Sequence, residues 1–97
     1  MVTVERADRE VRIQIRGEFT FKIRQEFRDA YCNDPPHAHY VVDLGGVNFM
    51  DSSAMGMLLV LREHAGGDHA DVTLTNLSQK LTALLKVASL HEMFKIS

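Results

Sequence analysis

One stretch of the sequence decides the fold: YVVDLGGVNFMDSSAMG, at residues 40–56. The valine-rich run Tyr40 to Leu44 is short and apolar, which predicts an inner strand of a sheet. Asp51-Ser52-Ser53 then precede residues that are apolar at helical spacing, so we expect a helix from about Ser52 to Ala65. Gly45 to Met50 should form the loop between the two. The stretch therefore predicts a strand, loop and helix unit with Asp-Ser-Ser at the start of its helix.

The residues before this unit show first a strand pattern and then a helix pattern. Val2 to Glu5 and Val11 to Arg16 alternate apolar and polar side chains, as half-buried strands do. The polar interval between them suits a hairpin turn. Thr20 is placed to cap a first helix, and Pro35-Pro36 follow its end. The apolar residues of that helix recur at helical spacing: Ile23, Phe27, Ala30 and Tyr31.

The same alternation of helix and strand follows the central helix. Gly66-Gly67 suits a helix C-terminus, because glycine readily adopts the left-handed conformation that commonly closes a helix. Val72 to Thr75 alternates as a strand, Ser78 is placed to cap a third helix, and Met93 to Ile96 predicts a last short strand. Each helix can then connect neighbouring parallel strands. The order predicts an α/β fold with a mixed sheet of four to five strands and about three helices, in a single domain covering residues 1–97.

Composition and charge argue against several classes of protein. The chain has 97 residues, of which 45% are hydrophobic and 25% charged, with a net charge of -2, as in an ordinary globular domain. No lysine or arginine cluster could neutralise a row of phosphates, so nucleic acid is not an expected partner. The longest apolar run, Met55 to Leu61, is far shorter than the ~20 residues that cross a bilayer. The N-terminus also lacks the pattern of a signal peptide. We expect a cytoplasmic protein without a membrane partner.

The start of the central helix is suited to a regulatory group. The first turn of a helix presents unpaired backbone N–H groups and the positive end of the helix dipole, so a phosphate on Ser52 is tolerated without unfolding. Asp and Ser are also preferred N-cap residues, so the sequence could serve for capping alone. Asp51, Ser52 and Ser53 supply more capping groups than one helix needs, which favours the regulatory interpretation.

Apolar residues are expected on the surface beside these serines. Val47, Phe49 and Met50 are unusually apolar for a loop. In the helix, the apolar residues cover an arc of about 200°, whereas a surface helix needs a stripe of roughly 100°. Either this helix is well buried in a small core, or its side chains reach a partner, with Met57, Val60 and His64 as candidates.

These residues resemble the signature of the STAS domain family. The resemblance is carried by Asp43-Leu44, Gly46-Val47 and the run from Phe49 to Gly56. It extends to Gly17-Glu18-Phe19 before the first helix and to the residues from Thr75 to the end of the chain. The fold that it implies is the STAS-like α/β fold, in agreement with the pattern of strands and helices.

The resemblance implies an anti-sigma factor antagonist that works by partner switching. Such a domain binds an anti-sigma factor when unphosphorylated, which frees a sigma factor for transcription, and phosphorylation ends the binding. The expected partners are an anti-sigma factor that is also a serine kinase and a phosphatase of the PP2C type. The residue directly after the aspartate of the motif is the modified one, which here is Ser52, with Ser53 as the second choice. The predicted partner contacts are Asp51, Ser52, Ser53, Phe49, Met50, Met57 and Val60.

Other functions have less support in the sequence. The chain has no Gly-x-Ser-x-Gly elbow, Walker loop or dinucleotide fingerprint, and no histidine lies close to the serines, so we expect neither an enzyme nor a cofactor. His37 with His39, and His64 with His69, lack further ligands at a characteristic spacing, so no metal is expected. The alternative that remains is a STAS scaffold without a switch, or a regulatory subunit of a transporter or signalling complex that binds a protein or small ligand.

Overall fold

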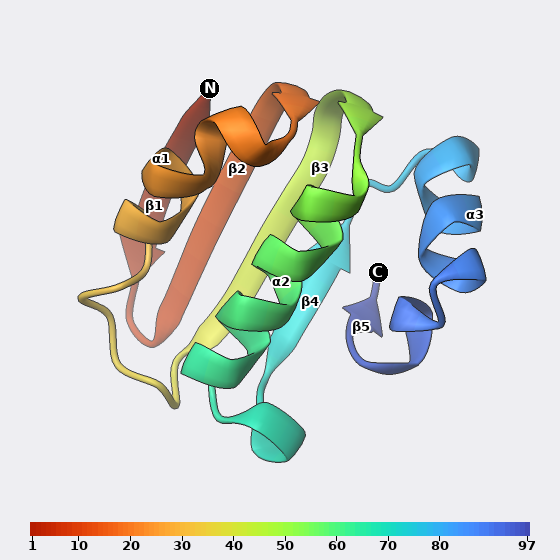
Figure 1. The fold of residues 1–97 in the computed structure, drawn as a ribbon. Coiled ribbons are helices and arrows are strands. Elements are labelled where there is room, and N and C mark those ends of the chain that lie inside the picture. The colour runs from red at the N-terminus through yellow and green to blue at the C-terminus, as the bar shows by residue number, and fades with distance from the viewer.

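The computed structural model describes residues 1–97, and the chain alternates strands and helices throughout (Figure 1). Three short 3-10 turns, at Phe21–Ile23, Gly67–His69 and Leu90–Glu92, join the main elements. Those elements are, in chain order, β1 (Val2–Ala7), β2 (Glu10–Phe19), α1 (Arg24–Asp29), β3 (His39–Met50), α2 (Ser52–His64), β4 (Val72–Thr75), α3 (Gln79–Val87) and β5 (Lys95–Ile96).

The five strands form one mixed sheet in the order β1-β2-β3-β4-β5. The hairpin strands β1 and β2 are antiparallel, with Val4 opposite Ile13, and every later neighbour is parallel. A helix connects each parallel pair, as a crossover between parallel strands requires. The predicted α/β class, with five strands and three helices, is confirmed.

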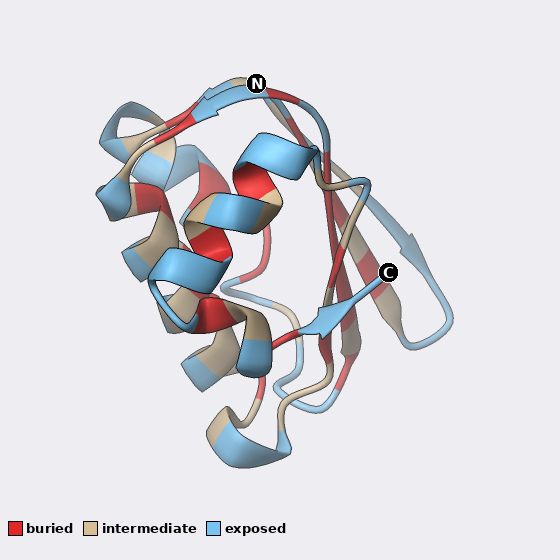
Figure 2. Ribbon diagram, turned by 90° about the vertical axis from the view of Figure 1, so that its right-hand side faces the viewer, coloured by how far each residue is buried: buried red, intermediate tan, exposed pale blue.

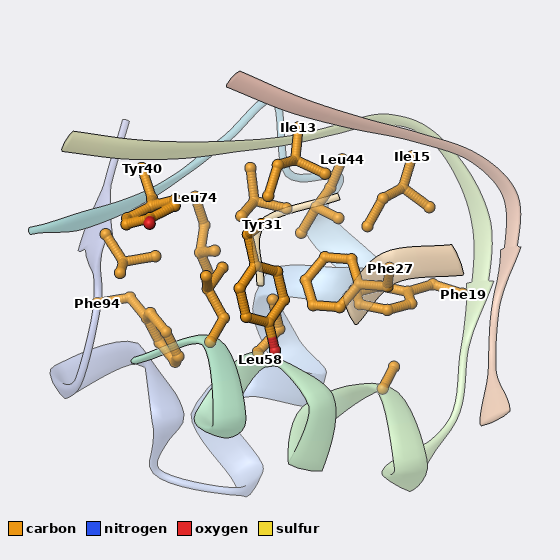
Figure 3. Packing of buried hydrophobic residues seen from close by; sticks show 14 of the residues in the cluster. Ile13, Ile15, Phe19, Phe27, Tyr31, Tyr40, Leu44, Leu58, Leu74 and Phe94 are labelled. Carbon is orange, nitrogen blue, oxygen red and sulfur yellow. The ribbon is translucent and has the colours of Figure 1, made fainter. Parts of the chain in front are cut away.

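The core lies between one face of the sheet and the helices. Strand residues such as Ile13 and Leu44 point toward Leu58 of α2, and all three are at most 1% exposed (Figure 3). Figure 2 shows the buried residues on the sides of the helices and strands that face one another. Each such side chain contributes on the order of 1.5–3 kcal/mol when it leaves water. Phe27 of α1 and Leu85 of α3 also belong to this core, so both helices pack against it.

The predicted cap of the third helix is present, since the Ser78 hydroxyl accepts a hydrogen bond from the Leu81 N–H at 3.1 Å. Thr20 accepts one from the Lys22 N–H, but it caps the 3-10 turn Phe21–Ile23, and α1 follows that turn without a side-chain cap of its own. Gly66 follows α2 with a φ of 122°, which is strained for residues with a side chain. These positions were predictable because capping depends on residues close together in the sequence.

The predicted loop at residues 45–50 is wrong, because β3 does not end at Leu44 but continues to Met50. Its second half pairs with β2, with Gly17 opposite Val47 and Phe19 opposite Met50. Gly46 stands where the two strands approach closely, since a Cβ at this position would lie 2.9 Å from Arg16 Cγ. The glycine pair that indicated a loop therefore marks a register shift within a long strand.

Asp43, the one buried charged residue, fastens the shifted part of β3 to the end of β4. Its Oδ1 accepts hydrogen bonds from the Gly45 N–H at 2.9 Å and from the Asn76 side chain at 3.0 Å. Arg12 lies 3.4 Å from Oδ2. Burial alone would raise the pKa of Asp43, but these donors outweigh it and hold the pKa below its ordinary value. The carboxylate thus holds the strand that leads into α2.

Candidate functional site

Asp51 alone separates β3 from α2, and it performs the cap that the sequence predicted for this junction. Its backbone is extended, and Oδ1 accepts a hydrogen bond from the Ala54 N–H at 2.9 Å. The Asp51 N–H in turn donates to the Phe19 carbonyl of β2 at 3.4 Å. One residue therefore both starts the helix and ties it to the neighbouring strand.

The two serines after Asp51 have no structural task of this kind. Ser52 is the first residue of α2 and is exposed, and Ser53 is half-buried. Neither hydroxyl forms a hydrogen bond within the protein, since the cap is supplied by Asp51. The surplus of capping groups noted in the sequence is thus a pair of unused hydroxyls at the positive end of a helix of 13 residues.

The structure removes one residue from the predicted partner contacts. Met50 is only 4% exposed and belongs to the core, because its strand turns this side chain toward the helices. Phe49, which points the other way, is 44% exposed. Val60 is 57% exposed and Met57 is partly buried against the core, so both reach the surface of α2. Asp51 is half-buried at the start of α2.

A groove of about 480 Å³ runs between α1 and α2. The α2 side is formed by residues three and four apart, which share a helix face: Ser53, Gly56, Met57 and Val60. From the other side come Phe21, Arg24 and Arg28, and Phe21 is 54% exposed. These three residues were not predicted from the sequence. A phenylalanine directly after the Thr20 cap was the one local signal of an exposed apolar residue there.

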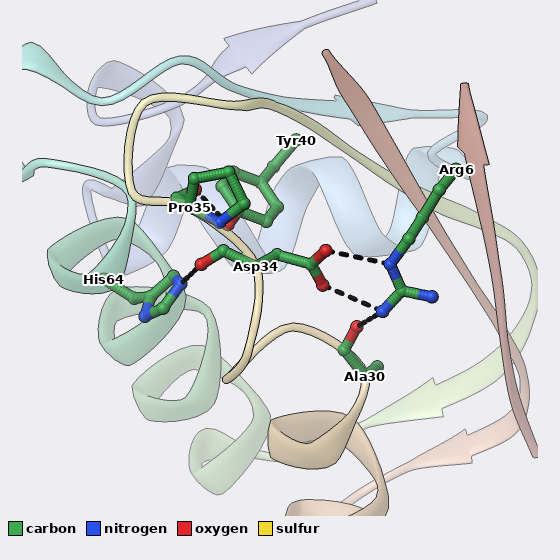
Figure 4. A network of polar contacts seen from close by, with 6 residues as sticks. All are labelled: Arg6, Ala30, Asp34, Pro35, Tyr40 and His64. Atoms are coloured by element: carbon green, nitrogen blue, oxygen red, sulfur yellow. Dashed lines mark hydrogen bonds and ion pairs between the residues drawn. The ribbon is translucent and has the colours of Figure 1, made fainter. Parts of the chain in front are cut away.

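The opposite end of α2 carries a network in which the polar groups are paired (Figure 4). Both Asp34 carboxylate oxygens accept hydrogen bonds from Arg6 at 2.8 Å, and Arg6 also donates to the Ala30 carbonyl. His64 Nε2 lies 2.8 Å from the Asp34 carbonyl oxygen and therefore donates to it. The Tyr40 hydroxyl donates to the Pro35 carbonyl at 2.7 Å.

This network accounts for one predicted candidate and shifts several pKa values. His64 was a candidate partner contact, but its ring holds the 30–36 segment and packs 5.1 Å from the Tyr31 ring. It also lies twelve residues, about 18 Å of helix, from Ser52. The hydrogen bonds from Arg6 lower the pKa of Asp34, and burial raises the pKa of Tyr40 to about 12.

Two further observations concern metals and membranes. No group of three or more histidine, cysteine, aspartate or glutamate side chains is placed to hold a metal ion. His39, one of the histidines considered above, lies 2.9 Å from Asp71 on the sheet. None of the helices combines the length and apolar character that a bilayer crossing demands.

Comparison with known proteins identifies the family. Residues 2–95 match the family model described as "Mlab, STAS domain". A STAS-domain containing protein of Pseudomonas aeruginosa (strain UCBPP-PA14) is 46% identical over 89 residues, which cover 91% of this chain and 88% of that protein.

Solved structures show the same fold at low sequence identity. The anti-sigma factor antagonist SpoIIAA in its unphosphorylated form superposes with a TM-score of 0.83 at 18% identity, covering 100% of this chain and 88% of that one. A sulfate transporter family protein from Wolinella succinogenes has a TM-score of 0.73 at 16% identity, covering 92% and 78%. The fold is thus shared by antagonists and by transporter-associated domains, and the chain belongs to the STAS domain family.

Proposed function

We propose that this STAS domain is an anti-sigma factor antagonist that binds its anti-sigma factor while Ser52 is unmodified and releases it when Ser52 is phosphorylated. The observation that carries the proposal is the Ser52 hydroxyl, which is exposed and forms no hydrogen bond at the first position of α2. Asp51, and not Ser52, caps this helix. A hydroxyl that the fold does not use is free for modification. The proposal treats residues 1–97 as one domain that acts by binding proteins in the cytoplasm and catalyses no reaction.

A phosphate on Ser52 would leave the fold intact. It adds about -1.5 to -2 charges and three strong acceptor oxygens. The helix dipole and the free N–H groups of the first turn favour an anion at this position. Asp51 keeps its hydrogen bond to Ala54, because the phosphate is attached to a different side chain. The consequence of phosphorylation is therefore local, and it falls on whatever protein docks against Ser52.

Exposure distinguishes the two serines as sites of phosphorylation and identifies the remaining partner contacts. Ser52 is exposed to a kinase, whereas Ser53 is half-buried at the edge of the groove, so Ser52 is the first choice and Ser53 the second. Phe49 supplies apolar contact area just before α2, and Met57 and Val60 supply it along the helix. The partners of the proposal are an anti-sigma factor with serine kinase activity and a PP2C-type phosphatase, as the family resemblance implies.

The proposal is tested by titration calorimetry against each anti-sigma factor of the source organism, produced recombinantly. Wild type and Ser52→Ala should bind one of them, and Ser52→Asp should bind at least tenfold more weakly. Ser89→Asp adds the same charge after α3 and is the matched control, with unchanged affinity. With ATP, the anti-sigma factor should add one phosphate to the wild type, mapped to Ser52 by mass spectrometry. Equal binding by all variants would contradict the proposal.

A second candidate function is a regulatory subunit of a transporter complex. The description of the matching family model and the fold similarity to the Wolinella succinogenes sulfate transporter family protein support it. In that case no anti-sigma factor would bind in the titration. A transporter subunit should then co-purify with the chain, and the Ser52→Asp substitution should leave that association unchanged.

A further inference from the structure

The groove between α1 and α2 is positively charged on a protein with a net charge of -2. Arg24 and Arg28 line it, and no aspartate or glutamate does. Arg24 lies 4.0 Å above the Phe21 ring, and neither guanidinium forms an ion pair. Two carboxylates of α1 form hydrogen bonds with groups other than these arginines. Glu26 accepts the Val2 N–H, and Asp29 accepts a hydrogen bond from Gln25. The arginines are therefore free to meet external carboxylates.

Gly56, in the wall of this groove, has no purpose inside the molecule. It lies within α2, where glycine is a poorer helix former than alanine. A Cβ at this position would meet no atom within 4 Å, so packing does not exclude a side chain. At about 100° per residue, Gly56 lies 40° from Ser52 and one turn further along the helix. The missing side chain leaves a gap in the helix surface beside the serine.

Apolar side chains stand on both sides of this gap. Phe21 on one rim is 54% exposed and Val60 on the other is 57% exposed, with Met57 between them in the groove. Large side chains exposed together at a groove are the usual anchors of a helix-in-groove contact. The groove thus offers an apolar floor with fixed positive charge on one wall.

We infer that this groove receives an amphipathic segment of the partner whose apolar residues enter between Phe21 and Val60 and whose carboxylates face Arg24 and Arg28. The close approach of that segment depends on the absent side chain of Gly56. The inference rests on the proposed function for the identity of the partner, but the groove chemistry can be tested separately.

The inferred occupant gives the switch a physical mechanism. A phosphate on Ser52 stands one turn from Gly56, at the end of the groove, and its charge has the same sign as the carboxylates of the partner. Repulsion between like charges, together with competition for the positive field of the arginines, weakens docking without any refolding. An acidic partner is therefore released more completely by phosphorylation than a neutral one.

The charge preference is tested with two model peptides of 16 residues that share a leucine stripe at helical spacing. One carries glutamates on its polar face and the other carries lysines. Nuclear magnetic resonance titration should show the glutamate peptide shifting the amide signals of Ser53, Gly56 and Val60, with at least fivefold tighter binding than the lysine peptide. Arg24→Glu with Arg28→Glu should reverse this preference. Lys80→Glu with Lys86→Glu, on α3, is the matched control and should leave it unchanged.

The role of Gly56 is tested with Gly56→Leu, which fills the gap. The glutamate peptide should then bind at least tenfold more weakly, while circular dichroism shows the helix retained. Gly56→Ala should give a smaller loss and controls for helix propensity, which it improves. Equal binding of both peptides, unchanged binding by Gly56→Leu, or a dimer of the chain abolished by Gly56→Leu would each overturn the inference.

The outcomes separate this inference from the proposed function. If an anti-sigma factor binds but its affinity ignores the arginine reversal, the function stands and the groove inference fails. If the peptides behave as expected and no anti-sigma factor binds, the groove chemistry stands and the proposed function fails.

Discussion

The two ends of α2 differ in how their polar side chains are used. At the C-terminal end, His64, Asp34, Arg6 and Tyr40 all form hydrogen bonds that hold the 30–36 segment to the sheet and the helix. At the N-terminal end, Asp51 alone forms the cap, and the Ser52 and Ser53 hydroxyls have no partner. Phe49, two residues before Asp51, is an exposed apolar side chain at the N-terminal end.

This difference separates stability from function within one helix. Polar groups that leave water must be paired, because an unpaired buried group costs about 1–3 kcal/mol. The C-terminal network satisfies this condition and needs no external partner. The serines at the other end stay in contact with water, so the fold gains nothing from them. Under the proposed function their role is binding or modification, and substitutions at the two ends should therefore have different consequences.

The largest effect on stability is expected from Asp34→Ala. It removes two charge-assisted hydrogen bonds to Arg6, and because Arg6 is 52% exposed the expected loss in free energy of unfolding is about 1–2 kcal/mol. Urea denaturation measures this. The matched control is Asp68→Ala, whose carboxylate lies 3.2 Å from Arg62 but is 94% exposed, and its effect should stay below about 0.5 kcal/mol. Equal losses for the two variants would contradict the comparison.

At the other end, the cap should matter and the serines should not. Asp51→Ala is expected to lower the free energy of unfolding by about 1 kcal/mol, because the Ala54 N–H loses its acceptor. Ser52→Ala and Ser53→Ala should each stay within about 0.5 kcal/mol of the wild type, as exposed substitutions usually do. The same urea experiments decide the point. A loss at Ser52 as large as at Asp51 would show that the serine has a structural task after all.

Gly56→Ala should stabilise the protein by about 0.5–1 kcal/mol, since alanine is the better helix former and a Cβ meets nothing within 4 Å. Thermal unfolding would show a raised midpoint. Gly46→Ala is the contrasting variant, because its Cβ would lie 2.9 Å from Arg16 Cγ, and it should lower the midpoint. The pair distinguishes a glycine required by the fold from one that the fold does not need.

Part of the pH dependence of stability is expected to come from the C-terminal network of α2. The pKa of Asp34 is lowered from 3.8, so its contribution to stability is present above that pH and is lost as the pH falls toward the lower folded value. Burial raises the pKa of Tyr40 from 10.0 to about 12, so its contribution is present below pH 10 and is lost as the pH rises from 10 to 12. The midpoint of urea denaturation, measured across pH, records both the loss of stability at acid pH and the loss at alkaline pH.

Two variants test this assignment. Asp34→Asn should make the loss of stability at acid pH smaller without abolishing it, because the pKa of Asp43 is lowered too, and it should leave the alkaline loss unchanged. Tyr40→Phe should reduce the alkaline loss and leave the acid one unchanged. If neither substitution changes the loss assigned to it, other groups control the pH dependence.

Much of the fold was predictable because its signals are local. Alternation in Val11 to Arg16 located part of β2, and Thr20, Asp51 and Ser78 occupy positions where a side chain caps the turn that directly follows it. The start of α2, predicted at about Ser52, agrees with the structure. Such signals depend on neighbours within about four positions, so they survive without knowledge of the tertiary structure.

The candidate site was predictable only in part. The second half of β3 was mistaken for a loop because its glycines suggested a turn, while its true partner, β2, lies about 30 residues earlier in the chain. The same pairing buries Met50 and exposes Phe49. The groove was missed because Arg24 and Arg28 come from a different helix than the serines. No short-range pattern reports a contact of this kind.

The sequence by itself determined the order of the elements, the α/β class and the place of Ser52 at the N-terminus of a helix, since periodicity and capping are properties of adjacent residues. The tertiary structure alone decided which hydroxyls remain unbonded, which apolar side chains stay outside the core and which charges meet at one groove. Those outcomes depend on how distant segments pack, because burial is a property of the surroundings of a side chain and not of its type.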